Sequence, residues 1–129
     1  MPIEAFAHYN LRADRVLLDE LCTFYRDIVG LALGNRPPLR SHGYWLYAGG
    51  KDILHLSEAR QGEVRQINVA GTFDHVAFAC SGRAAIETRL LEKHVAFSTN
   101  QVPSTGQVQL FFKDPAGNGV ELNFADSDA

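Results

Sequence analysis

Residues 114–124 read Asp-Pro-Ala-Gly-Asn-Gly-Val-Glu-Leu-Asn-Phe. Asp-Pro followed by Gly-Asn-Gly predicts a turn, because proline fixes φ while glycine and asparagine tolerate a positive φ. Val120, Leu122 and Phe124 then alternate with polar residues, which predicts a strand with one apolar face. Glu121 must point away from that face, so its carboxylate is either solvated or held in a polar cavity.

Length and composition limit the classes of protein to consider. A chain of 129 residues is expected to form a single domain, and its net charge of -3 gives no reason to expect nucleic acid or an anionic membrane as a partner. No apolar run approaches the ~20 residues of a membrane span, and the N-terminus does not read as a signal peptide, so we expect a cytoplasmic protein. Cys22 and Cys80 belong to no metal motif and are predicted to be buried free thiols.

The pattern of apolar residues predicts the same order of elements, β-α-β-β-β, in each half of the chain. In the first half Asp14 is the expected helix N-cap and Gly30 the expected C-cap, and in the second half Ser81 is the expected N-cap. The predicted strands are 4–11, 31–34, 43–48, 52–57, 73–80, 95–98, 107–113 and 120–124, with helices over 14–30 and 81–93.

Matching residues in the two halves indicate an internal duplication. Phe6-Ala-His8 corresponds to Phe73-Asp-His75 at a shift of 67 residues, and His55 corresponds to Glu121 at a shift of 66. The sequence therefore predicts two similar units, one at about 3–57 and the other at about 73–125, joined by a linker at 58–72.

The duplication also aligns four residues that can bind metal. His8 and His75 lie on the predicted first strand of each unit, and His55 and Glu121 on the last. Imidazoles suit Zn, Fe, Ni and Co, and two histidines with one carboxylate form the facial triad of non-haem Fe(II) chemistry. Alternatively, the four residues form a hydrogen-bonded polar plug with a purely structural role.

Four stretches resemble the vicinal oxygen chelate superfamily, which includes glyoxalase I, extradiol dioxygenases and the bleomycin resistance proteins. They are Phe6-Ala-His8, the helix end at 24–31, Phe73-Asp-His75-Val-Ala-Phe, and residues 114–122. The resemblance implies an α+β fold in which two βαβββ units form an open eight-stranded half-barrel cup, the glyoxalase/bleomycin resistance/dihydroxybiphenyl dioxygenase fold. It also implies a divalent metal at the base of the cup and a homodimer, in many members with swapped units.

By this resemblance His8, His75 and Glu121 match metal ligands widely used in the superfamily, and His55 matches the fourth ligand position. Glyoxalase I usually has Glu or Gln there, so His55 is either a ligand or an acid–base group, and His55 and Glu121 are the candidate catalytic residues. The metal is Fe, Mn, Ni, Zn or Co. No residues match a glutathione-binding set, which argues against glyoxalase I itself.

The resemblance places Phe111 on the wall of the cup, and the duplication places Trp45 at the same position of the first unit. Tyr47 and Gln109 are further candidates for substrate binding. Aromatic walls suit a planar or apolar small-molecule substrate.

The functional prediction is a metal-dependent enzyme that chelates two vicinal oxygens of a small substrate. Dioxygenase-like chemistry is slightly preferred over lyase or isomerase chemistry, because the ligand set contains two histidines and one carboxylate. The alternative function is that of a metal-free resistance protein that sequesters a drug or other small molecule.

Overall fold

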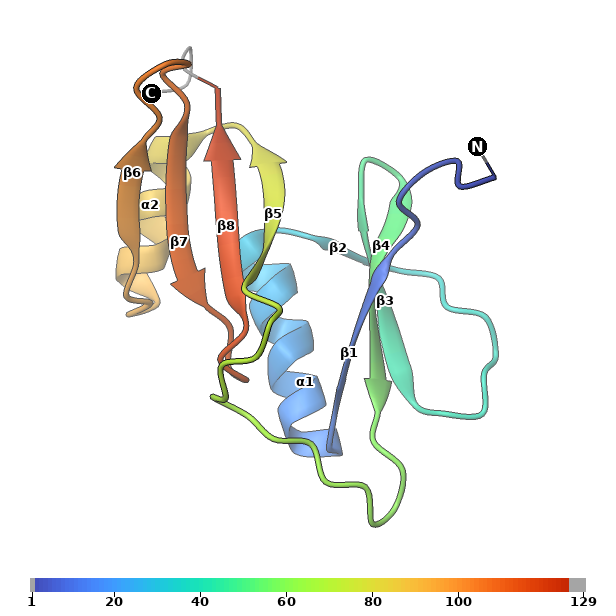
Figure 1. The fold of residues 1–129 in the computed structure, drawn as a ribbon. Helices are drawn as coiled ribbons and strands as arrows, with labels where there is room; N and C mark the ends of the chain where they lie inside the picture. Colours follow the sequence, from blue (N-terminus) through green and yellow to red (C-terminus); the bar gives the residue numbers. More distant parts are fainter. Residues whose placement is uncertain (1, 126–129) are drawn as a thin grey trace. The chain divides into compact units, whose positions relative to one another are not determined.

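The structure is a computed structural model that describes residues 2–125. The chain divides into two compact units, with the boundary between Gln66 and Ile67. Each unit carries one four-stranded sheet, with strand order β1-β4-β3-β2 in the first and β5-β8-β7-β6 in the second (Figure 1). The α+β architecture with two βαβββ units is therefore confirmed.

The elements of the first unit are β1 (Tyr9–Ala13), α1 (Arg15–Phe24), the π-helical turn η1 (Tyr25–Val29), β2 (Ala32–Gly34), β3 (Gly43–Ala48) and β4 (Lys51–Glu58). The Asp14 side chain accepts a hydrogen bond from the Leu17 amide, and Gly30 ends the helical segment in the left-handed region at φ 98°. Both predicted helix caps are confirmed, because a carboxylate satisfies a free amide and glycine takes a positive φ without steric cost.

The elements of the second unit are β5 (His75–Cys80), α2 (Arg83–Glu92), β6 (Ser98–Gln101), β7 (Val108–Lys113) and β8 (Gly119–Phe124). In Figure 1, α2 lies against one face of this sheet, and its buried residues are Ile86 and Leu90. The prediction of Ser81 as N-cap is wrong, since Gly82 takes that position with a left-handed backbone and no side-chain hydrogen bond.

Strand register shows the duplication directly. In the first unit β1 and β4 are parallel with Asn10 opposite His55, and in the second β5 and β8 are parallel with Ala77 opposite Glu121. The middle strands agree as well, because β3 places Trp45 opposite His55 and β7 places Phe111 opposite Glu121. The shifts of 66 and 67 residues found in the sequence are thus shifts between equivalent positions in two sheets.

Two strands differ from their predicted ranges by three or more residues at one end. The first strand begins at Tyr9 instead of residue 4, because its pairing with β4 runs only from Tyr9 to Ala13, and His8 lies immediately before it. The strand predicted at 95–98 instead spans Ser98–Gln101, because it pairs with β7 as a fully exposed edge strand. Its residues are all polar, so hydrophobic alternation could not have indicated its position.

Each sheet has one apolar face that forms the core of its unit. In β8, Val120, Leu122 and Phe124 are fully buried, which confirms the predicted alternation. In the first unit Leu54 and Leu56 of β4 correspond to Val120 and Leu122, and Leu46 of β3 is buried with Leu18 and Leu21 of α1. The predicted polar site residues therefore belong to the opposite face of each sheet.

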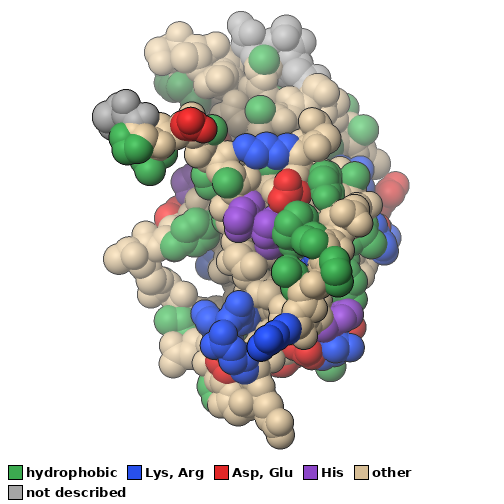
Figure 2. Space-filling view, turned by 90° about the vertical axis from the view of Figure 1, so that its right-hand side faces the viewer, with side chains coloured by type: hydrophobic (Ala, Val, Ile, Leu, Met, Phe, Trp, Pro, Cys, Tyr) green, Lys and Arg blue, Asp and Glu red, His purple; other side chains and the backbone are tan. Residues whose placement is uncertain are grey.

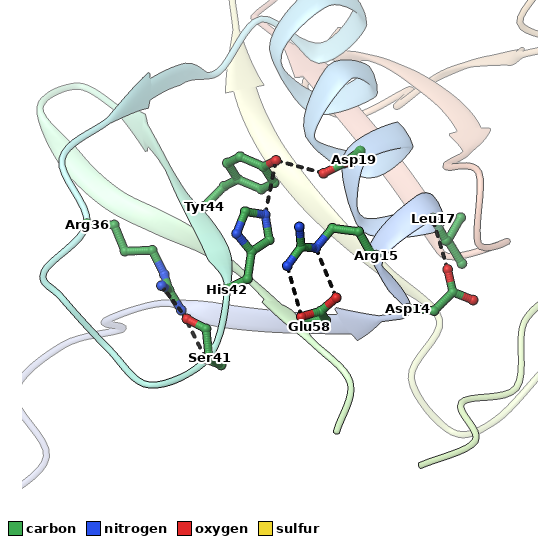
Figure 3. A network of polar contacts seen from close by, with 9 residues as sticks. All are labelled: Asp14, Arg15, Leu17, Asp19, Arg36, Ser41, His42, Tyr44 and Glu58. Atoms are coloured by element: carbon green, nitrogen blue, oxygen red, sulfur yellow. Dashed lines mark hydrogen bonds and ion pairs between the residues drawn. The ribbon is translucent and has the colours of Figure 1, made fainter. Parts of the chain in front are cut away.

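Polar contacts tie α1 to its own sheet (Figure 3). Arg15 Nε lies 2.9 Å from Glu58 Oε2, and the Tyr44 hydroxyl donates to Asp19 Oδ1 at 2.7 Å. This hydrogen bond to a carboxylate raises the pKa of Tyr44 to about 12, because ionisation of the phenol would remove the donor.

Both cysteines are free, as expected, but only Cys22 is buried, while Cys80 is half-buried. Burial raises the pKa of the Cys22 thiol. No helix within residues 2–125 has the length and apolar character needed to cross a membrane.

Candidate metal and substrate site

Three aromatic rings of the first unit form a stack on the polar face of its sheet. The His55 ring lies between the ring of His8, at a centroid distance of 3.7 Å, and the indole of Trp45, at 3.9 Å. The planes are within 14° and 7° of parallel, and His55 is only 8% exposed. The two flanking rings cover both faces of the His55 imidazole, so only its edge nitrogens can react.

One edge nitrogen of His55 already has a partner. Nε2 lies 2.7 Å from Asp52 Oδ2, and this hydrogen bond lowers the pKa of the Asp52 carboxyl. Carboxylates that hold one imidazole nitrogen fix the orientation and tautomer of the ring, both in metal sites and in acid–base catalysis. Asp52 therefore leaves Nδ1 of His55 as the nitrogen that can bind a metal or exchange a proton.

The second unit brings a histidine and a carboxylate together. His75 Nε2, on β5, lies 3.1 Å from Glu121 Oε1, on the neighbouring strand β8. The other nitrogen, Nδ1, lies 2.8 Å from Asp74 Oδ2. These contacts raise the pKa of His75, mainly through the hydrogen bond to Asp74, with further contributions from the charges of Glu121 and Asp74.

Glu121 is a buried carboxylate, only 6% exposed. Its Oε2 accepts hydrogen bonds from the side-chain amides of Gln109, at 3.4 Å, and Asn123, at 3.2 Å. Buried carboxylates need such partners, because an unpaired charge away from water is costly. The alternative left open by the sequence is thus decided: Glu121 lies in a polar environment built by its own unit.

The aromatic residue predicted for the substrate wall of this unit lies beside the same pair. The Phe111 ring meets the His75 ring edge-on, at a centroid distance of 5.8 Å. Tyr47, by contrast, is directed toward β2, where its hydroxyl donates to the Asn35 carbonyl at 2.6 Å.

The four predicted ligands are therefore grouped as two pairs, His8 with His55 and His75 with Glu121, one in each unit. Across residues 2–125 no three His, Cys, Asp or Glu side chains come together in an arrangement that would hold a metal ion. The donor chemistry of each pair fits a divalent transition metal, since imidazole and carboxylate are common ligands and Asp74 holds Nδ1 of His75, which leaves Nε2 on the side of Glu121. Neither pair is a complete site by itself.

Histidine side chains gather on the surface shown in Figure 2, with acidic and basic side chains close by.

Sequence reasoning missed the two aspartates that orient the histidines, Asp52 and Asp74, and the amide of Asn123. A signal existed for each, because Asp74 directly precedes His75, Asp52 precedes His55 by three residues, and Asn123 lies two residues after Glu121 on the same face of its strand.

Comparisons with known proteins support the fold. The chain is similar to the crystal structure of a lactoylglutathione lyase from Agrobacterium tumefaciens, with 24% identity, a TM-score of 0.68 and coverage of 98% of both chains. It is also similar to a glyoxylase/bleomycin resistance protein/dioxygenase domain from Frankia sp. EAN1pec, with 20% identity, a TM-score of 0.74, and coverage of 95% of this chain and 98% of that one. No protein-family model matches the sequence, and no curated protein matches it. The resemblance of the sequence motifs to the vicinal oxygen chelate superfamily is confirmed at the level of the fold.

Proposed function

We propose that this protein is a divalent-metal-dependent enzyme that acts on a small substrate with two adjacent oxygens. The observation that carries the proposal is the pairing of candidate ligands at equivalent positions of the two sheets, each pair with a histidine oriented by an aspartate. A structural polar plug would explain buried, hydrogen-bonded residues such as Glu121, but His8 and His75 are both exposed and open to a ligand.

The residues that would hold the metal are His8, His75 and Glu121, with His55 as the fourth ligand or as an acid–base group. Since each unit supplies one pair, a site with three or four protein ligands needs both pairs, from one chain or from two chains of a homodimer. A bound divalent metal acts as a Lewis acid and stabilises negative charge on the substrate oxygens.

The side chains of the chain itself have separate tasks. Asp52 holds Nε2 of His55, so that Nδ1 is the nitrogen left to accept or release a proton. The amides of Gln109 and Asn123 keep the Glu121 carboxylate in place. Trp45 and Phe111 provide flat apolar surfaces beside the histidines, which suit a planar substrate body.

Dioxygenase-like chemistry remains the first candidate, because His8, His75 and Glu121 make a set of two histidines and one carboxylate. Lyase or isomerase chemistry is the second, and lyase is the activity named for the Agrobacterium neighbour. Iron in the isolated protein would favour the first, and zinc or nickel the second.

Elemental analysis of protein purified without added metal tests the proposal, together with thermal unfolding in the presence of Fe(II), Mn(II), Co(II), Ni(II) or Zn(II). We expect bound metal and a raised midpoint for the wild type, and loss of both in His75→Ala. His94→Asn is the matched control, because His94 has a positive φ of 57° that asparagine tolerates. Absence of metal and of any stabilisation would favour the sequestering function.

Mixing two inactive variants distinguishes an intra-chain site from an inter-chain site. If each metal draws on unit 1 of one chain and unit 2 of another, mixed dimers of His8→Ala and Glu121→Ala contain one intact site and regain metal. If each site lies within one chain, the mixture stays metal-free. A mixture of His75→Ala and Glu121→Ala, both altered in the second unit, should regain no metal in either case.

A further inference from the structure

Three residues form a row across the polar face of the second sheet. His75 on β5 is opposite Gly119 on β8, and Gly119 is opposite Lys113 on β7. Residues paired in this way direct their side chains to the same face, and adjacent strands lie about 4.8 Å apart. The backbones of His75 and Lys113 are therefore roughly 10 Å apart, with a glycine between them.

A cavity lies beside His75, where the backbone of Asp74 approaches Gly119 closely. A cavity of about 280 Å³ is lined by residues that include His75, Phe111, Lys113 and Gly119. A Cβ atom at Gly119 would approach the carbonyl oxygen of Asp74 to 2.3 Å and the Cβ of His75 to 2.9 Å. Any larger residue at this position would thus collide with the backbone at Asp74.

The charges around this cavity leave one group without a counter-ion. Asp74 and Glu121 are both hydrogen-bonded to His75, and Asp114, next to Lys113 in sequence, accepts hydrogen bonds from the turn at Ala116 and Asn118. No hydrogen bond or ion pair joins the exposed Lys113 ammonium to another residue in the described part of the chain. A cation at the edge of a partly apolar cavity favours an anionic ligand group.

We infer that Lys113 anchors an anionic group of the substrate, such as a carboxylate, while the substrate body lies over Gly119 and against Phe111 and its reacting oxygens face His75 and Glu121. The inference deepens the proposed function and rests on it for the position of the reacting oxygens. The substrate class is therefore a small aromatic or apolar acid whose carboxylate is separated from its two adjacent oxygens by about the width of a six-membered ring.

Two probes that differ only in the carboxylate test this assignment. 3,4-Dihydroxybenzoate and catechol are titrated into zinc-loaded and metal-free protein, with affinity measured by calorimetry and the contact site by amide chemical shifts of Gly119 and Lys113. We expect the wild type to prefer 3,4-dihydroxybenzoate, and Lys113→Met to bind it about tenfold more weakly, as expected for loss of a charge-assisted hydrogen bond. Catechol affinity should stay unchanged in Lys113→Met.

Lys113→Arg should keep the preference for the anion, and Lys93→Met, at the end of α2, should match the wild type. Thermal unfolding of each variant verifies folding, with Lys113→Gln as a second neutral variant.

If zinc binds but Lys113→Met leaves the ratio of the two affinities unchanged, the anchor is wrong while the proposed function stands. If zinc does not bind but the anion preference persists and depends on Lys113, the proposed function is wrong and the anchor stands. Failure of the wild type to bind 3,4-dihydroxybenzoate at millimolar concentration would also overturn the anchor.

Discussion

His75 Nε2 lies 3.1 Å from Glu121 Oε1, although the two residues come from strands at opposite ends of the second unit in sequence. The parallel pairing of β5 with β8 brings them together. We predict that Glu121→Gln, which keeps the shape of the side chain but removes its charge, weakens metal binding by at least about 100-fold. At saturating metal this corresponds to about 2.7 kcal/mol of lost ligand-linked stabilisation, measurable as a smaller zinc-dependent rise in the unfolding midpoint. An unchanged zinc effect in this variant would exclude Glu121 as a ligand.

Asp74 is expected to act on the metal through His75. Because its carboxylate holds Nδ1, Asp74→Ala should allow the other tautomer and lower metal affinity by roughly 10- to 100-fold. Asp74→Asn should restore much of the affinity, because the amide oxygen can still accept the hydrogen bond. Nitrogen-15 NMR of the metal-free protein at alkaline pH, where the His75 ring is neutral, checks the cause directly, since the wild type should carry its ring proton on Nδ1. If Asp74→Ala changes neither the tautomer nor the affinity, Asp74 has no orienting role.

The contact between Tyr44 and Asp19 predicts a stability effect at alkaline pH. The pKa of Tyr44 is raised from 10.0 to about 12, mainly by the hydrogen bond to Asp19, so the phenol is held in its neutral form in the folded state. The contribution to stability is complete below pH 10 and is lost as pH rises through about 12. The free energy of unfolding in urea should therefore differ more between the wild type and Tyr44→Phe at pH 8 than at pH 11.5.

Asp19→Asn tests whether the carboxylate is the cause of this pH dependence. The Tyr44 pKa should return toward its usual value in that variant, which ultraviolet titration of tyrosine ionisation can follow. A difference between the wild type and Tyr44→Phe that stays constant from pH 8 to pH 11.5 would contradict the prediction.

Asp114 stabilises the turn that begins the last hairpin strand. Its Oδ1 accepts the amides of Ala116 and Asn118, both at 2.9 Å, and the residue is buried. Asp114→Ala leaves these donors unpaired, so we predict a loss on the order of 2 kcal/mol in the free energy of unfolding. Asp114→Asn should lose less, because its amide oxygen can accept the same two bonds. Equal losses in the two variants would mean that the charge, and not the hydrogen bonds to the turn, stabilises this loop.

Much of the fold could be predicted because its signals are local or repeated. The Asp14 cap, the Gly30 cap and the alternation through Val120, Leu122 and Phe124 each depend on a few neighbouring residues. The equivalence of His8 with His75 and of His55 with Glu121 needed only the two shifts along the sequence. These signals do not depend on long-range packing, so they can be recognised from the sequence alone.

The remaining features depend on tertiary contacts. The first strand, β1, starts at Tyr9 because its pairing with β4 begins at Leu54. No local sequence pattern indicates where this pairing begins. The stack of Trp45 on His55 follows from the register between β3 and β4, and the hydrogen bond of Tyr47 to the Asn35 carbonyl follows from the pairing of β2 with β3.

The strand order β1-β4-β3-β2 determines when, during synthesis on the ribosome, the first donor pair can form. Arg12 and Ser57 are hydrogen-bonded across β1 and β4 although 45 residues separate them, so His8 meets His55 only when nearly the whole first unit has been made. At about 5 to 20 residues per second, the second unit then takes roughly 3 to 13 seconds more. The nascent chain therefore passes through a period in which it can hold a stacked pair of imidazoles but no Glu121, and any metal captured at that stage would be bound by nitrogen ligands alone.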